Sequence, residues 1–188
     1  IAKHQKVLTI IMTVSDTTVP TISGDTTYSY EYGSTGHELS WTVFDLDPAT
    51  YTIYLDNVVN GTGNWTTGAL EKDIDNLYIG TYNYTLVILD MSGNTDVHTV
   101  IVTVSDTTIP TISGDATYSY EYGSLGNELS WTVYDLDPAT YIIYLDNVEN
   151  GTGDWSNGLL NKSIDNLDVG EYNYTLVIED VSGNSETH

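Results

Sequence analysis

The sequence has little positive charge and no cysteine. Four Lys plus Arg stand against 27 Asp plus Glu, which gives a formal net charge of −23. Such a field repels nucleic acid and anionic lipid, so we expect neither as a partner. Without cysteine the chain has no disulfide, thiolate ligand or thiol nucleophile. The charge suits high salt, divalent cations or solubility at high local concentration.

Long apolar runs and helix-forming residues are also scarce. No run of about 18 apolar residues occurs, so we expect no membrane insertion in this segment. No signal peptide is visible. Tyrosine, in contrast, occurs 16 times, and Thr, Asn, Gly and Ser are abundant. This composition is typical of an all-β protein with a hydroxyl-rich surface.

The chain contains two copies of one unit with a period of 90 residues. "VSDTTVPTISGDTTYSYEYGS" from Val14 returns almost unchanged from Val104, and "ELSWTVFDLDPATYTIYLDN" from Glu38 returns from Glu128. Copies this alike indicate a recent duplication, which a spacer tolerates and from which an enzyme gains little. The predicted domains are an N-terminal strand over 1–13, a first repeat over 14–103 and a second repeat over 104–188.

Each repeat alternates apolar and polar residues with the period of a β-strand. Leu39, Trp41 and Val43 alternate with Ser40 and Thr42. Turn residues interrupt such runs about every ten positions, and no window has a convincing helical period. The pattern predicts an all-β fold with two tandem β-sandwiches.

Two motifs, "LYIGTYNY" and "LDVGEYNY", are similar to the tyrosine corner at the start of the penultimate strand of immunoglobulin-like domains. With "DTTVPTI", "LSWTV" and "LDMSGN", the whole unit resembles bacterial and archaeal immunoglobulin-like repeats, including hyalin-repeat-like modules, which occur in tandem in surface proteins. The resemblance covers essentially the full chain. It implies two tandem immunoglobulin-like β-sandwiches at an extracellular or cell-surface location. The cysteine pair of antibody domains is missing, and Trp41 lies on an earlier strand than the antibody tryptophan.

Motifs for catalysis are absent. The sequence has no G-x-S-x-G, H-E-x-x-H or phosphate loop. Asp45 and Asp47 are a carboxylate pair of the type used in acid–base chemistry, but no pattern predicts a cleft around them. We therefore expect a protein that is not an enzyme.

Six Asn-x-Ser/Thr sequons occur, three in each repeat. Some are expected by chance in a chain rich in Asn and Thr. However, Asn83 and Asn173 alternate with Tyr84 and Tyr174, so a glycan on either would project away from the core. We expect covalent N-glycans on several of the six sites: Asn60, Asn64, Asn83, Asn150, Asn161 and Asn173.

Acidic residues are predicted to gather at one end of each sandwich. An immunoglobulin-like strand order places the loop after the second strand, the loop before the last strand and the incoming linker at the same end. Calcium binds several oxygens at about 2.3–2.6 Å, which makes it the predicted cofactor, and an ion there would stiffen the joint between domains. The alternative is that these are ordinary turn residues. The candidate metal ligands are Asp16, Asp45, Asp47 and Asp90, and in the second repeat Asp106, Asp135, Asp137 and Asp180.

Aromatic residues offer an alternative function, a cell-surface module that binds carbohydrate or a protein. A polysaccharide platform would need several rings exposed together, and half or more of them are expected in the core. The candidates are Tyr30, Tyr32, Tyr51, Tyr54, Trp65 and their copies.

The leading prediction is a structural segment of an extracellular filament, stalk or adhesin. "SDTT" followed by proline at each repeat boundary predicts short extended linkers, and hence domains placed end to end. The partners would be copies of the same chain, arranged head to tail.

The N-terminal "KVLTIIMT" is a strand sequence with no sandwich of its own, while the second repeat lacks the counterpart of "TVIVTV". One explanation is that a longer array continues beyond the sequence shown. The other is donor-strand assembly, in which this segment completes the second sandwich of a neighbouring copy. The predicted subunit contacts are Lys6, Val7, Leu8, Thr9, Ile10, Ile11, Met12, Thr13 and Val14, with Tyr172, Tyr174, Leu176 and Ile178 on the acceptor.

Overall fold

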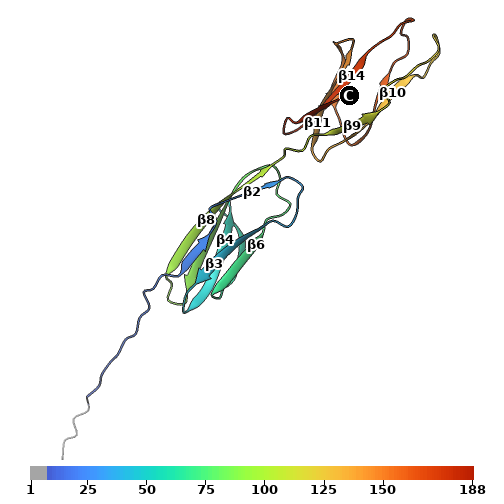
Figure 1. Ribbon diagram of the computed structural model, residues 1–188. Coiled ribbons are helices and arrows are strands. Elements are labelled where there is room, and N and C mark those ends of the chain that lie inside the picture. The colour runs from blue at the N-terminus through green and yellow to red at the C-terminus, as the bar shows by residue number, and fades with distance from the viewer. Residues whose placement is uncertain (1–7) are drawn as a thin grey trace, which may run out of the picture. The chain divides into compact units, whose positions relative to one another are not determined.

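A computed structural model describes residues 8–188 and divides the chain into two units (Figure 1). The first unit holds the chain up to Tyr30 together with Ser34–Val104, and the second holds Glu31–Gly33 together with Ser105–His188. Every regular element within residues 8–188 is a β-strand. Accordingly, this part of the chain has no helix of the length and apolar character that a membrane span requires.

The first unit is a sandwich of a three-stranded and a five-stranded sheet. Their strand orders are β1-β3-β6 and β2-β8-β7-β4-β5. The strands are β1 Thr21–Gly24, β2 Thr27–Glu31, β3 Glu38–Phe44, β4 Pro48–Leu55, β5 Val58–Asn64, β6 Gly68–Asp73, β7 Gly80–Asp90 and β8 Thr95–Ser105.

The second unit repeats this arrangement with fewer strands. Its sheets have the orders β13-β10-β9 and β12-β11-β14-β15. The strands are β9 Thr111–Gly114, β10 Glu128–Tyr134, β11 Pro138–Leu145, β12 Val148–Asp154, β13 Gly158–Ser163, β14 Tyr174–Asp180 and β15 Ser185–Thr187.

The predicted alternation of buried and exposed residues is present in the strands. In β3, Leu39, Trp41 and Val43 are buried while their neighbours are exposed. In β7, Leu86 and Ile88 lie on the buried face. Successive side chains of a strand point to opposite faces, so each strand contributes one row to the core between the sheets. The predicted all-β fold with immunoglobulin-like β-sandwiches is confirmed.

The tyrosine corner is also confirmed in both units. Tyr82 Oη donates a hydrogen bond of 2.8 Å to the carbonyl of Tyr78, four residues earlier. Tyr172 Oη donates one of 3.1 Å to the carbonyl of Asp168. In the first unit this bond ties the loop before β7 to the strand itself, while in the second unit it lies within the segment that leads into β14.

The last strand is where the two units differ. In the first unit, the pairing of β8 with β7 runs from Thr95 opposite Leu89 to Val104 opposite Gly80. Val104 therefore completes the first sandwich, although the second sequence repeat begins there. Its side chain and those of Val100 and Val102 are at most 2% exposed. In the second unit, β15 pairs only with Val177–Glu179 of β14.

The second sandwich is correspondingly more open beside β14. Tyr30, Leu39 and Tyr84 are buried in the first unit, whereas their equivalents are only partly buried. Residues 117–121 and 170–173, which correspond to β2 and to the start of β7, form no strand in the structure. The equivalents are Tyr120, Leu129 and Tyr174.

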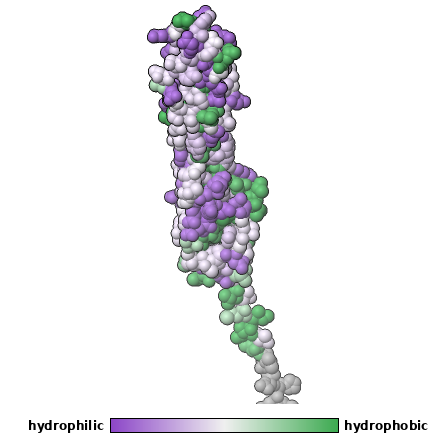
Figure 2. All heavy atoms as spheres, turned by 90° about the vertical axis from the view of Figure 1, so that its right-hand side faces the viewer, coloured by the Kyte–Doolittle hydropathy of each residue, from purple (hydrophilic) through white to green (hydrophobic). Residues whose placement is uncertain are grey.

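The predicted N-terminal strand takes no strand conformation in the part that the structure describes, residues 8–13. Five apolar side chains between Leu8 and Val14 are 79–88% exposed. Figure 2 shows this stretch as the hydrophobic part of the chain next to the grey atoms. A strand needs a neighbour for its backbone groups, and no described residue pairs with this one. Lys6 and Val7 lie outside the described residues.

Candidate functional site

Three aspartates meet at the same place in each unit. Asp16, Asp45 and Asp90 each offer a carboxylate oxygen, and these oxygens lie within 4.8 Å of one another. Asp106, Asp135 and Asp180 form the equivalent cluster in the second unit. The contributors are the incoming segment, the turn after β3 or β10 and the end of β7 or β14. The strand order expected for the immunoglobulin-like fold brings these segments together.

Each carboxylate is held by backbone groups of its own turn. In the second unit, Asp106 Oδ1 accepts a hydrogen bond from the Thr108 N–H at 2.9 Å. Asp135 Oδ1 accepts one from the Asp137 N–H at 2.8 Å. These bonds fix the turns and leave the second oxygen of both side chains for another partner.

Asp47 and Asp137 do not join the clusters. The Asp47 N–H donates to Asp45 Oδ1 at 2.8 Å, and the Asp47 carbonyl accepts from the Met91 N–H. The backbone of Asp47 is therefore used to hold the turn, and its side chain lies outside the group of facing oxygens. Asp137 has the equivalent backbone bonds in the second unit.

Two asparagines complete the clusters, and the sequence pattern alone does not predict them. Asn184 Nδ2 donates to Asp180 Oδ2 at 2.8 Å and to the carbonyl of Asp106 at 3.2 Å. Asn94 makes the same pair of contacts, to Asp90 and Asp16, in the first unit. Each asparagine thus ties the incoming segment to the last hairpin. The repeated "SGN" that contains them indicates only a hairpin turn.

These clusters concentrate negative charge away from solvent. Asp45, Asp90, Asp135 and Asp180 are 2–6% exposed. The chain has four lysines and no arginine. Of the two lysines within residues 8–188, Lys72 Nζ donates to the carbonyl of Asn60, and Lys162 makes the equivalent contact with Asn150. Buried carboxylates this close repel one another unless a proton or a cation lies between them.

Asp106 has both an unpaired oxygen and a shifted pKa. Its Oδ2 is buried, and no donor among the described residues reaches it. Burial is the largest cause of a pKa of Asp106 above its ordinary value; the Thr108 N–H opposes it, while the charges of Asp180 and Asp135 and the Glu31 carboxyl act in the same direction as burial. In contrast, hydrogen bonds outweigh the effect of burial at Asp90 and lower its pKa. The second cluster therefore includes a carboxylate with a buried oxygen that has no hydrogen-bond donor among the described residues.

The geometry of the clusters fits a hard divalent cation. Two oxygens that each lie about 2.4 Å from one ion can be at most about 4.8 Å apart, so oxygens this close can share a calcium ion. Backbone carbonyls of the same loops and water would supply the remaining oxygens of a six- to eight-coordinate site. All donors are oxygens, which excludes a soft-metal site.

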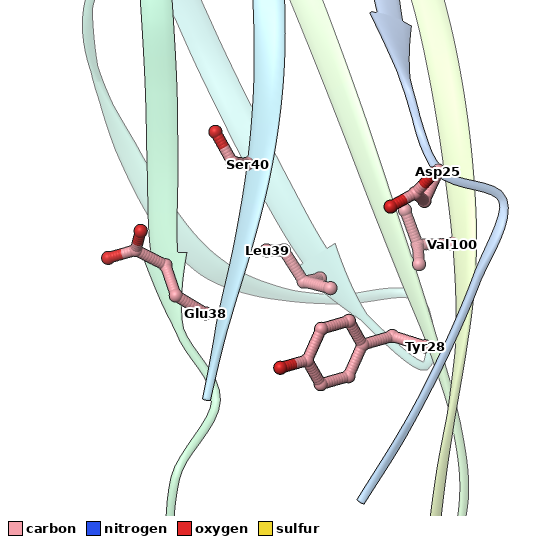
Figure 3. Close-up of a pocket in the computed structure, with 6 residues that line it drawn as sticks. All are labelled: Asp25, Tyr28, Glu38, Leu39, Ser40 and Val100. Carbon is pink, nitrogen blue, oxygen red and sulfur yellow. The ribbon is translucent and has the colours of Figure 1, made fainter. Parts of the chain in front are cut away.

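A pocket of the first unit contains a second pair of acids. It is lined by Asp25, Tyr28, Glu38, Leu39, Ser40 and Val100. In Figure 3 the Asp25 and Glu38 side chains lie on opposite sides of the pocket, and the Tyr28 ring lies near Leu39 and Val100. The lining thus combines two acids and two hydroxyl groups with the apolar side chains of Leu39 and Val100.

All six sequon asparagines are exposed. Asn83 and Asn173 lie on the outer face, as the alternation predicts. Ser130 Oγ donates to Asn161 Oδ1 at 2.7 Å, which leaves the amide nitrogen of Asn161 directed elsewhere. The geometry thus leaves each site accessible to a glycosylating enzyme.

The aromatic residues do not form an exposed platform as a group. Tyr30, Trp65 and Trp155 are 5–7% exposed and belong to the cores. Trp65 Nε1 donates to the carbonyl of Leu89, and Trp155 Nε1 donates to that of Glu179. These three rings are therefore not available for stacking on a sugar.

The predicted acceptor residues fall into two groups. Leu176 and Ile178 are fully buried in the core of the second unit. Tyr172 is 39% exposed, and Tyr174 is partly buried beside it. The open part of the edge is therefore the Tyr174 end of β14 together with the residues that precede it, including Tyr172.

No family model and no curated protein match this chain. Among solved structures, the fibronectin(III)-like modules of Clostridium thermocellum CbhA are 13% identical, with a TM-score of 0.37 over 89% of this chain and 90% of that one. SGBP-B of the Bacteroides ovatus mixed-linkage glucan utilization locus, in complex with a mixed-linkage heptasaccharide, is 18% identical, with a TM-score of 0.38 over 90% of this chain and 46% of that one. The N-terminal four Ig domains of Dscam1 isoform 7.44 are 14% identical, with a TM-score of 0.39 over 89% and 44%. Likeness at this level carries no argument about function, and the fold assignment rests on the strands and cores of the chain itself.

Proposed function

We propose that this chain is a non-catalytic structural subunit of an extracellular filament, in which copies join head to tail by strand donation. Residues 9–14 of one copy would complete the second sandwich of the next, in the place that β8 occupies in the first. The observation that carries the proposal is that the chain contains both a free strand sequence and a free sheet edge that fit each other. By the 90-residue period, the exposed apolar segment is equivalent to β8 and the open edge beside β14 is equivalent to β7. In the first unit, β7 and β8 are already paired.

The register of the donor follows from the 90-residue period. Ile10, Met12 and Val14 correspond to Val100, Val102 and Val104, which are buried in the first sandwich. Thr9, Ile11 and Thr13 correspond to the exposed residues 99, 101 and 103 of β8. The segment thus has the apolar row that the slot requires, with hydroxyl or partly exposed residues on the other face.

The acceptor edge begins where the existing pairing ends. Leu176 exchanges two backbone hydrogen bonds with His188. The donor would continue from there, with Thr9 beside Thr175, Ile11 beside Asn173 and Val14 beside Gly170, as in the register of β8 on β7. Leu8 would coincide with His188, so the donated strand begins at Thr9.

The energetic gain favours occupation of the slot. Burying three apolar side chains of this size contributes roughly 1.5–3 kcal/mol each. The backbone of residues 170–173 would also gain strand partners. A contact between different surfaces of two copies gives an open filament when the rotation from one copy to the next does not close a ring, and a filament is the form we propose.

Calcium in the aspartate clusters is part of the proposal. The support is the orphaned oxygen of Asp106 among three carboxylates, and the repetition of the arrangement in both units. A bound ion would neutralise the repulsion and fix the incoming segment to the turn after β10 and the end of β14. The structural role would be stiffening and not catalysis.

The location and family are proposals of the same kind. The resemblance to bacterial and archaeal immunoglobulin-like repeats, the six exposed sequons and the negative surface support a glycosylated protein outside the cell. Glycans on Asn83 and Asn173 would cover the outer face of the long sheet.

Assembly of purified chain with substitutions on the two faces of the donor tests the proposal. Met12→Gln would put an amide into the core of the neighbouring sandwich without a partner, and we expect it to raise the critical concentration for assembly at least about tenfold. Thr13→Gln would place the same amide on the exposed face and is the matched control. Both residues are exposed in the isolated chain, so neither change should alter the melting temperature of the monomer.

Light scattering and electron microscopy would give the critical concentration of both variants. Normal assembly of the Met12→Gln chain would contradict the proposal. An equal effect of the two substitutions would contradict the register.

A further inference from the structure

The second unit includes three residues from a distant part of the chain, Glu31–Gly33. The Glu31 carboxylate accepts hydrogen bonds from the Thr107 N–H at 2.6 Å, from Thr107 Oγ1 at 3.1 Å and from Thr108 Oγ1 at 3.1 Å. The Thr107 N–H is the largest cause of a lowered Glu31 pKa. The charged form of Glu31 is thus the form that these bonds stabilise.

Gly33 makes the second contact of this segment. A side chain at Gly33, where φ is +77°, would overlap Leu136 Cδ1. Leu136 is 53% exposed, while its equivalent Leu46 is 92% exposed. Glycine is therefore favoured by the backbone conformation, and any side chain there would also displace the end of the Leu136 side chain.

Residues equivalent to each side of this contact occur elsewhere in the chain, each without its counterpart. Thr17, Thr18 and Leu46 are the equivalents of the receiving residues, and all three are exposed. Glu121–Gly123 is the equivalent of the inserted segment. Gly123 has φ +81°, and a side chain there would meet no atom within 4 Å. Within the described residues this contact is therefore formed once, and the residues equivalent to its two sides are exposed.

We infer that Glu121–Gly123 of one copy docks on Thr17, Thr18 and Leu46 of the next copy. The inference rests on the proposed strand donation, because Thr17 follows the donor segment by three residues, as Thr107 follows Val104. The Glu121 carboxylate would accept hydrogen bonds from the Thr17 N–H and the two threonine hydroxyls. Leu46 of the next copy would cover Gly123. The joint between copies would then consist of the inserted strand and this separate docking contact.

The two sides of the docking contact can be changed without touching the donor strand. We expect Glu121→Ala and Leu46→Ala each to raise the critical concentration for assembly, Glu121→Ala by about tenfold, because it removes hydrogen bonds to a charged group. Glu149→Ala and Leu159→Ala remove exposed side chains of the same kinds and are the matched controls. In chains kept below the critical concentration, Glu31→Ala should lower the melting temperature, while Glu121→Ala should not.

Each outcome separates the two proposals. If Met12→Gln blocks assembly and Glu121→Ala and Leu46→Ala leave the critical concentration unchanged, the docking contact is wrong and strand donation stands. If Met12→Gln does not block assembly, strand donation itself is wrong. A lower monomer melting temperature for Glu121→Ala would mean that Glu121 supports its own sandwich, which would also overturn the docking contact.

Discussion

Leu176 and His188 exchange two backbone hydrogen bonds of 2.9 Å each, in the register that Leu86 and His98 have in the first sandwich. Beyond this pair toward Gly170, the edge of the second sandwich has no strand neighbour among the described residues. Tyr172, Tyr174 and Leu129 are more exposed than their equivalents in the first unit. An unpaired edge beside a partly open core is a template for another strand. Under the proposed strand donation, a second copy of the chain supplies that strand.

Calcium should stabilise the second unit through Asp106. Adding millimolar calcium to chelator-treated chain should raise the melting temperature of that unit, since an ion that binds only the folded state stabilises it by mass action. Asp106→Asn should remove most of this increase. Differential scanning calorimetry of both chains, with Asp115→Asn as an exposed control, measures the effect. Identical melting of the native chain with and without calcium would contradict the site.

The same substitution predicts a pH dependence without calcium. The pKa of Asp106 is raised in the folded state, mainly by burial. The folded chain therefore binds more protons than the unfolded chain, and stability falls as the pH rises from about 3.8 through the folded pKa. Asp106→Asn should be free of this loss and should melt at a higher temperature than the native chain at pH 7 in chelator. A lower melting temperature for the variant would show that the carboxylate is not under strain from its neighbours.

Loss of either tyrosine corner should destabilise its own unit. Tyr82→Phe removes the hydrogen bond to the Tyr78 carbonyl and leaves that carbonyl exposed to solvent, which should cost about 1 kcal/mol. For a domain of this size the melting temperature should fall by about 4–8 °C. Tyr172→Phe should have a similar effect on the second unit, and Tyr122→Phe, at a side chain that is 64% exposed, should have almost none. A change at Tyr122 as large as that at Tyr82 would argue against the corner as the cause.

Glycans should be present on native material at several of the six sequons. Peptide mapping by mass spectrometry after glycosidase treatment would locate them. Because all six asparagines are exposed, we expect modification at the five that lie on strands as well as at Asn173, which does not. Six unmodified asparagines on native protein would rule out a role for glycans in this protein.

The sequence predicted the features that depend on local periodicity and on strand order. The alternation through Trp41 and Leu86 defines the sandwich faces because neighbouring residues of a strand point to opposite sides. The meeting of Asp45 and Asp90 follows from the order of the strands that carry them. These features need only the pattern and the topology.

Other features depend on contacts that no local pattern encodes. The Asp47 N–H holds the Asp45 carboxylate, while the Asp47 side chain lies outside the cluster. Glu31 reaches Thr107 across 76 residues of sequence, and its sequence context is that of an ordinary strand end. Asn184 has the sequence context of a turn residue, although its side chain joins two segments 78 residues apart. Such roles follow from side-chain geometry and are visible only in three dimensions.

Strand donation between copies has a direct test in the predicted pairing of Ile11 with Asn173. The backbone N–H and carbonyl of Asn83 bond to Asp56, away from β8. Asn83 and Ile101 therefore form a non-hydrogen-bonded pair, whose Cα atoms lie about 4.5 Å apart in a regular ladder. That distance permits a disulfide, whereas a shift of two residues, to about 7–8 Å, does not.

The chain has no cysteine, so a bond can form only between introduced residues. One chain would carry Ile11→Cys and another Asn173→Cys, and the two would be mixed, assembled and oxidised. Each chain has a single thiol, so any disulfide must join two copies. Strand donation predicts rapid formation of the mixed dimer, and little when Thr13→Cys replaces Ile11→Cys. Failure of the Ile11→Cys and Asn173→Cys chains to cross-link, or equal cross-linking by the Thr13→Cys chain, would contradict strand donation in this register.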